Sequence, residues 1–254
     1  MLASNTGHVG RLAPRSRNRH RRSYRIIKLE NLNDLNKEVI LLFTTFGYLF
    51  NNNIYTKKMA DRHHITADQA IRHLSEGNLR YIEDKIETPN IKSTQRYEYT
   101  KGQSPFAIIL NCADSRVVPE VIFDQGIGDL FVIRVAGNIA NPSSIASIEY
   151  AVAHIGCNLI IVLGHESCGA VGAAIDSYPD VDNGPNLNHL VSFITPAVEQ
   201  NMGAPIETVV RCNAENNAQT MLDNSDIIKQ YVNAGDLRIV PGYYGFESGK
   251  VDLF

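Results

Sequence analysis

Two short segments of this chain carry the side chains that could bind a metal ion. The first is Cys112-Ala113-Asp114-Ser115-Arg116, and the second, His165-Glu166-Ser167-Cys168-Gly169, follows later in the sequence. Thiolate, imidazole and carboxylate groups are the side chains that zinc accepts in a tetrahedral site. The sequence therefore predicts a zinc site whose candidate ligands are Cys112, Asp114, His165 and Cys168.

Asp114 differs from the other candidate ligands because it has a second potential partner. Arg116 lies two residues further on, and a guanidinium can hold a carboxylate in a bidentate ion pair. If Asp114 pairs with Arg116 instead of the metal, a coordination position becomes available for water, as in a catalytic zinc site. Arg116 should also lower the pKa of Asp114, by about 1–3 units. Asp114, kept ionised by Arg116, can therefore orient a zinc-bound hydroxide.

Both segments follow short apolar runs, at residues 106–110 and 159–164. Runs of this length between polar segments are typical of buried strands. In an open α/β sheet, ligand sites form at the carboxyl ends of the parallel strands. We therefore expect these two strands to bring the two segments to one edge of a sheet.

The remainder of the sequence from residue 59 onward alternates between strand and helix patterns. Further strands are predicted at residues 130–135 and 237–240. Helices are predicted at residues 66–82, 143–155, 187–199, 206–222 and 225–234, and one more begins near Cys168. This alternation predicts an α/β fold in which helices flank a mainly parallel sheet.

Residues 1–58 differ in composition from the rest of the chain. They hold 11 Lys and Arg against three acidic residues, whereas the remainder holds 13 against 24. Such a basic segment is typical of an organellar targeting peptide, of a disordered arm, or of upstream sequence translated from a misplaced start codon. We therefore expect a leader at residues 1–58 and a catalytic domain at residues 59–254. The expected location is the cytoplasm, or the mitochondrion if the leader is a targeting signal.

Charge and hydropathy limit the partners of the protein. The acidic domain disfavours nucleic acid as a partner, because phosphate binding needs clustered cations. The uncharged run at residues 39–50 is shorter than the roughly 20 apolar residues that cross a bilayer. We therefore expect no nucleic-acid partner and no membrane span.

The Cys-x-Asp-Ser-Arg and His-x-x-Cys-Gly motifs, in this order, resemble the signature of the β-class carbonic anhydrases. The resemblance covers about residues 62–254 and leaves the leader unexplained. It extends through further matching segments at residues 123–126, 128–132, 134–138, 149–152, 242–244 and 249–251. One departure is Val135, where many relatives have asparagine.

The resemblance implies a function and a site. The function is the reversible hydration of CO2 to bicarbonate and a proton, by attack of a zinc-bound hydroxide on CO2. Cys112, His165 and Cys168 would bind Zn²⁺, and Asp114 and Arg116 would form the catalytic dyad. In a closed, inactive state Asp114 would be an exchangeable fourth ligand, and in the open state it would hold the zinc-bound hydroxide.

The resemblance also implies how the site is completed and assembled. Gln103, Phe131 and Tyr150 would line the substrate pocket, partly across a dimer interface. The fold would be a four-stranded parallel core preceded by an N-terminal helical arm, and the protein would be a homodimer or a homotetramer.

Two other functions are compatible with the same residues. A hydrolase of carbonyl sulfide or carbon disulfide could use the same zinc site and differ only in the shape of its pocket. A non-catalytic zinc-binding assembly protein could use Asp114 as a permanent fourth ligand. Arg116 disfavours the assembly protein, because a permanently bound carboxylate would not need a competing partner.

Overall fold

The computed structural model describes residues 65–87, 100 and 102–254, and all elements below belong to this part of the chain. The leader predicted at residues 1–58 lies outside the described residues. The sheet consists of β1 (Ala107–Asn111), β2 (Leu130–Arg134), β3 (Leu159–His165), β4 (Arg238–Tyr244) and β5 (Val251–Leu253). The α-helices are α3 (Ala67–Ile82), α5 (Pro119–Ile122), α6 (Pro142–Tyr150), α7 (Gly169–Ser177), α8 (Pro185–Ser192), α9 (Thr195–Gln200), α10 (Ile206–Asn224) and α11 (Asp226–Ala234).

The sheet has the strand order β2-β1-β3-β4-β5, and its first four strands are parallel. This arrangement confirms the predicted α/β fold with a four-stranded parallel core. The edge strand β5 pairs antiparallel with β4 and was not predicted. At three residues, β5 is too short to give a periodic signal, and its pairing depends on the preceding turn.

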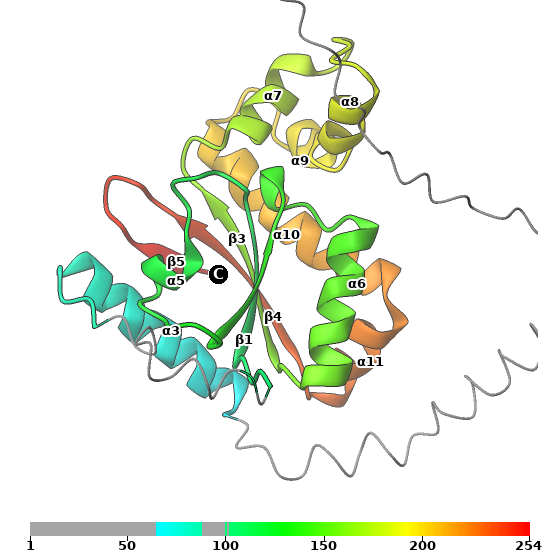
Figure 1. Cartoon of the computed structure of the whole chain (residues 1–254). Coiled ribbons are helices and arrows are strands. Elements are labelled where there is room, and N and C mark those ends of the chain that lie inside the picture. Colours follow the sequence, from blue (N-terminus) through cyan, green and yellow to red (C-terminus); the bar gives the residue numbers. More distant parts are fainter. Residues whose placement is uncertain (1–64, 88–99, 101) are drawn as a thin grey trace, which may run out of the picture. The chain divides into compact units, whose positions relative to one another are not determined.

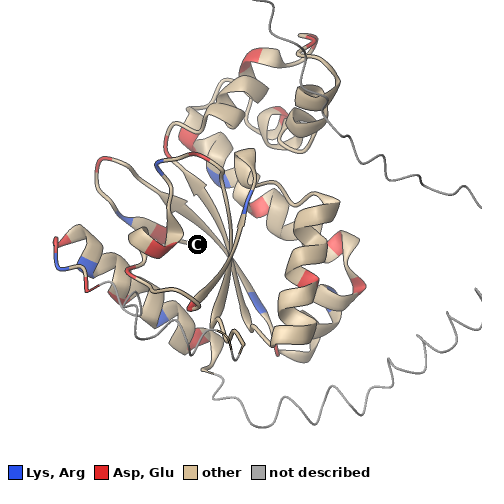
Figure 2. Ribbon diagram, viewed as in Figure 1, with Lys and Arg blue, Asp and Glu red and all other residues tan. Residues whose placement is uncertain are grey.

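Alternation along the strands places apolar side chains on both faces of the sheet. On β1, Ile108 and Leu110 belong to one buried cluster, and Ile109 belongs to another. The first cluster includes residues of α6, α10 and α11, and the second includes residues of α3 and α5. Figure 1 shows these two groups of helices on opposite sides of the sheet. Charged residues lie mainly on the helices and connecting loops (Figure 2). The sheet is thus buried on both faces, as expected for parallel strands.

The helix predicted at residues 187–199 is two helices. Helix α8 ends at Ser192 and α9 begins at Thr195. Pro196 stands in the first turn of α9, where backbone N–H groups have no partner within the helix, so a proline there costs no hydrogen bond. With α7, these two helices form the group beyond the sheet that is labelled in Figure 1. A third apolar cluster lies here and includes both Cys112 and Cys168. No helix of the described residues is long and apolar enough to cross a membrane.

The N-terminal helical arm is present as α3, which begins with a capping box between Thr66 and Gln69. Its Gly77 lies so close to the neighbouring segment that a Cβ atom there would stand 1.8 Å from the carbonyl oxygen of Phe123. Asn78, the next residue, donates to the carbonyl of Ile122 at 3.1 Å. The approach of α3 to the end of α5 therefore requires a glycine.

Substituting Gly77 with alanine should destabilise the fold. Alanine normally stabilises a helix relative to glycine by about 1 kcal/mol, but here its methyl group must displace backbone. We expect a loss of about 1–3 kcal/mol, the usual range for overpacking. Gly172→Ala in α7 is the matched control, because its Cβ would meet only Ile206 Cδ1, at 3.9 Å. Thermal unfolding should show opposite shifts for the two variants, and a stabilised Gly77→Ala protein would contradict this packing.

Candidate metal centre

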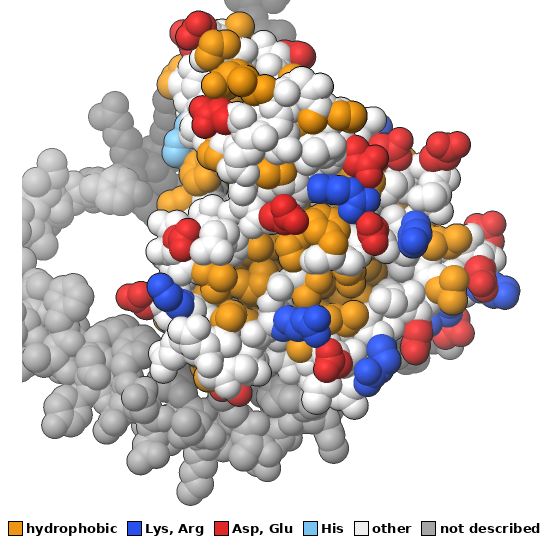
Figure 3. Space-filling view, turned by 180° about the vertical axis from the view of Figure 1, so that it is seen from behind, with side chains coloured by type: hydrophobic (Ala, Val, Ile, Leu, Met, Phe, Trp, Pro, Cys, Tyr) orange, Lys and Arg blue, Asp and Glu red, His pale blue; other side chains and the backbone are white. Residues whose placement is uncertain are grey.

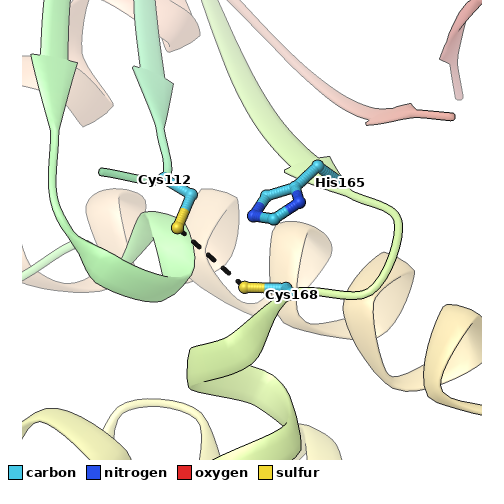
Figure 4. Close-up of side chains that lie close together, drawn as sticks. All are labelled: Cys112, His165 and Cys168. Carbon is cyan, nitrogen blue, oxygen red and sulfur yellow. Dashed lines mark hydrogen bonds between the residues drawn. The ribbon is translucent and has the colours of Figure 1, made fainter. Parts of the chain in front are cut away.

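Cys112, His165 and Cys168 meet at the carboxyl edge of the sheet. Cys112 directly follows β1, His165 is the last residue of β3, and Cys168 is the N-cap residue of α7. β1 and β3 are hydrogen-bonded neighbours, so the sheet itself places the first two side chains together. All three side chains are buried, and their ligand atoms lie within 4.8 Å of one another. Figure 4 shows them pointing toward a common centre.

The two cysteines form a polarised pair. The Cys168 thiol donates to Cys112 Sγ across 4.0 Å. This hydrogen bond lowers the pKa of Cys112 to about 4, against the opposing effect of burial, and it raises the pKa of Cys168. The backbone N–H groups of Asp114 and Gly137 also donate to Cys112 Sγ, each at 3.4 Å. The site therefore stabilises a thiolate at Cys112, which is the form that binds a metal.

His165 is oriented as a metal ligand. Its Nδ1 lies 2.9 Å from the carbonyl oxygen of Glu166, which fixes the proton on Nδ1. Its Nε2 is buried and has no hydrogen-bond partner among the described residues. A buried acceptor nitrogen without a partner is costly, and a metal ion would satisfy it. Two sulfur atoms and this nitrogen thus fit a metal ion.

Asp114 and Arg116 form an ion pair beside this cluster. Arg116 Nε donates to Asp114 Oδ1 at 3.0 Å, and Arg116 Nη2 donates to Asp114 Oδ2 at 2.7 Å. The Arg116 backbone N–H adds a third bond to Oδ1, also at 3.0 Å. The hydrogen bonds from Arg116 hold the pKa of Asp114 well below its usual range. The carboxylate is therefore ionised and bonded to Arg116.

Two residues on other elements hold the segments that carry the site, and the sequence reasoning missed both. Arg134, at the end of β2, donates to the carbonyl oxygens of Cys112 (3.3 Å) and Asp114 (2.5 Å). Buried Asn213 on α10 donates to the carbonyl of Gly137, whose N–H in turn bonds Cys112 Sγ. Arg134 stands in a motif already compared with the family, but nothing in the sequence connects Asn213 with a residue 76 positions away.

Val135, the departure from the family pattern, has an apolar environment. Its backbone N–H donates to the carbonyl of Asn111 at 3.1 Å, which continues the pairing with β1 one residue beyond the end of β2. Its half-buried side chain packs against two of the apolar clusters. Valine therefore suits this position without a polar partner.

The predicted pocket residues lie apart from the metal cluster of the same chain. In β2, Phe131 pairs with Ile108, whereas Arg134 pairs with Asn111 next to Cys112. Phe131 stands three positions before Arg134 along β2, which corresponds to about 10 Å of strand. The ring of Tyr150 lies 6.4 Å from that of Phe131 and is half exposed. Gln103 lies exposed in the segment before β1. The structure thus joins Phe131 with Tyr150 but brings neither to Cys112.

Comparison with known proteins agrees with this geometry. A family model described as carbonic anhydrase matches residues 107–251. Carbonic anhydrase 2 of Mycobacterium tuberculosis is 35% identical over 71% of this chain and 89% of its own length. Among solved structures, the β-carbonic anhydrase CcaA is 28% identical with a TM-score of 0.55, covering 73% of this chain and 88% of that protein.

A further structural similarity is to tetrameric β-carbonic anhydrases from Sordaria macrospora. It has a TM-score of 0.55 at 24% identity, over 74% of this chain and 97% of that protein, and it concerns the fold alone. The family match, in contrast, covers more than half of this chain and includes the whole metal cluster. The chain therefore belongs to the β-carbonic anhydrase family and is a carbonic anhydrase.

Proposed function

We propose that Cys112, His165 and Cys168 bind Zn²⁺ and that the enzyme hydrates CO2 reversibly to bicarbonate and a proton, with Asp114 and Arg116 as its catalytic pair. One observation carries this proposal. Two sulfur atoms and an unpartnered imidazole nitrogen face a common centre, while the neighbouring carboxylate is bonded to Arg116. Two thiolates and one imidazole are a common zinc ligand set of catalytic sites.

Bound zinc would act as a Lewis acid and lower the pKa of a coordinated water molecule toward neutrality. The chain supplies the rest of the chemistry. Asp114 is held ionised by Arg116, so it can accept a hydrogen bond but cannot donate one. It would therefore orient a water-derived nucleophile by accepting its O–H, and leave the oxygen lone pair directed at CO2.

Arg116 has two roles in this proposal. Its bidentate pairing with Asp114 keeps the carboxylate out of the ligand set, so that the ligand set has three protein groups. Its positive charge also opposes protonation of Asp114 over the working pH range. A non-catalytic assembly protein is not favoured, because the chain belongs to an enzyme family.

We propose that the active form is a homodimer or homotetramer, in which Gln103, Phe131 and Tyr150 complete the pocket of a partner subunit. The half-exposed ring of Tyr150 beside Phe131 supports this. A second feature in keeping with association lies on the face opposite to that of Figure 1, where hydrophobic side chains gather among charged ones (Figure 3). Light scattering on the full chain tests it, and a monomer at micromolar concentration would contradict it.

Substrate choice separates CO2 hydration from the alternative activity on carbonyl sulfide or carbon disulfide. Stopped-flow measurements on the same zinc-loaded sample should give a much higher kcat/KM for CO2 than for carbonyl sulfide. The ligands are the same for both reactions, so the ratio reports on the pocket alone. A higher kcat/KM for carbonyl sulfide would replace the proposed substrate while leaving the metal centre intact.

A further inference from the structure

The loop that joins β4 to β5, residues 245–250, is bonded to the segment that carries the metal ligands. Glu166, which lies between His165 and Cys168, accepts hydrogen bonds from the backbone N–H of Phe246 at 2.7 Å and of Glu247 at 3.4 Å. The Glu166 N–H donates in turn to the carbonyl of Tyr244 at 2.8 Å. Glu166 therefore fixes the backbone of this loop at Phe246.

The ring of Phe246 contacts one residue of the metal cluster, His165, and one of the catalytic pair, Arg116. The guanidinium carbon of Arg116 stands over the ring, 4.3 Å from its centroid. The imidazole of His165 lies 5.3 Å from the same ring, and Tyr244 meets it edge-on at 5.5 Å. Phe246 is half buried and packs against the apolar cluster on the α3 side of the sheet. Its position is thus set by packing, independently of Arg116.

Arg116 needs such a support. Its side chain is 57% exposed, and an exposed ion pair is normally weak, because two flexible side chains must be held in one geometry. In this site the guanidinium is held on two sides. Its edge is bonded to Asp114, and its face rests on the ring of Phe246, an arrangement that a planar cation favours.

We propose that Phe246 is a positioning residue for Arg116, and that Glu166 holds Phe246 in place. The ring keeps the guanidinium in the orientation that pairs with Asp114 and so keeps the carboxylate away from the metal ligands. The proposal rests on the proposed roles of Asp114 and Arg116. Neither Phe246 nor Glu166 contributes a group to the reaction itself.

Phe246→Leu, which keeps an apolar side chain but removes the aromatic face, tests the proposal in the full-length enzyme. Arg116 should leave Asp114 more often, and the free carboxylate would compete with water at the metal centre. We expect kcat to fall by about two- to fivefold, the range for an exposed cation–π contact, with KM unchanged. The pH of half-maximal activity should rise by about 0.3–0.7 unit, because more hydroxide is needed to displace the carboxylate. Phe246→Tyr keeps the aromatic face and should restore both values.

Glu166 is tested by a second matched pair of variants. Glu166→Ala removes the acceptor of the Phe246 N–H and should reproduce the upward pH shift of Phe246→Leu. Glu166→Gln keeps a side-chain oxygen for that bond and should lie closer to the wild type. A loss of activity in Phe246→Leu without a pH shift, or without recovery in Phe246→Tyr, would mean that Phe246 only packs, and would overturn the proposal.

A measurement in the metal-free protein tests the contact without any activity. The chain contains no tryptophan, so Phe246→Trp introduces a single indole under Arg116. Adding Arg116→Ala should uncover the indole and shift its emission to longer wavelength. Adding Arg211→Ala, which removes the guanidinium over Tyr243 and Phe254, should leave the emission unchanged.

The emission measurement and a CO2 hydration assay of Arg116→Ala distinguish failure of this proposal from failure of the proposed function. Unchanged emission after Arg116→Ala would overturn the contact between Phe246 and Arg116, whatever the catalytic role of Arg116. Full CO2 hydration by Arg116→Ala would contradict the proposed function, even if the emission shift shows that the contact exists.

Discussion

Cys168→Ser should lose the metal and, with it, nearly all CO2 hydration. Cys168 is one of three buried groups that converge on the metal centre, and a serine hydroxyl is a much poorer ligand than a thiolate. Mutations of residues that only support metal ligands typically cost 10–100-fold in affinity, so loss of a ligand should cost at least ~100-fold. Metal content after dialysis against a competing chelator, measured with activity on the same sample, checks this.

Part of the folded structure should weaken in the same variant. Cys168 is the N-cap residue of α7 and belongs to the apolar cluster around that helix, and metal binding is coupled to folding. Cys212→Ser is the matched control, because Cys212 is half-buried on α10, packs against the same apolar cluster, and does not belong to the group formed by Cys112, His165 and Cys168. Cys168→Ser with full metal content would refute the ligand assignment.

Arg116→Ala and Asp114→Ala should keep the metal and lose most of the activity. Both residues lie beside the three ligands, and their side chains bond to each other. Without Asp114 nothing in the pair accepts the O–H of the nucleophile, and without Arg116 the carboxylate is free to bind the metal. We expect kcat to fall by about 10²–10³, within the range for a positioned acid–base group. Stopped-flow CO2 hydration at matched metal content measures this loss.

The loss should be specific to this ion pair. Arg238 and Asp68 form a comparable exposed pair, with a distance of 2.7 Å, at the opposite end of the parallel strands. Arg238→Ala should therefore retain wild-type turnover. If Asp114→Ala turns over CO2 at the wild-type rate, the catalytic pair is wrong, although the metal centre could still be correct.

The sequence predicted the elements that bring the three candidate ligands together, because the relevant signals are local. One buried apolar run precedes Cys112 and another precedes His165, so two neighbouring parallel strands place both residues at one edge. Cys168 follows within one turn. Asp114 and Arg116 are two residues apart, so their pairing also needs no information about the fold.

The residues that support the site could not be predicted in the same way. Phe246 reaches Arg116 only because β4 lies beside β3 and the following loop turns back over the sheet edge. Glu166 shows no sequence signal for its bond to that loop, 80 residues away. Asn213 reads as an ordinary polar residue on a helix, yet it is fully buried and bonded to Gly137. Such contacts depend on how distant elements pack, and periodicity does not contain that information.

Removal and return of the metal test the central claim most directly. The full-length enzyme should lose CO2 hydration when a chelator strips its metal, and regain it when one Zn²⁺ per chain is restored. Stopped-flow rates and metal content are measured on the same samples, with metal-stripped Cys168→Ser treated in parallel. We predict recovery in the wild type and none in the variant. Full CO2 hydration by the metal-free wild-type protein would contradict the assignment of Cys112, His165 and Cys168 as the catalytic metal centre.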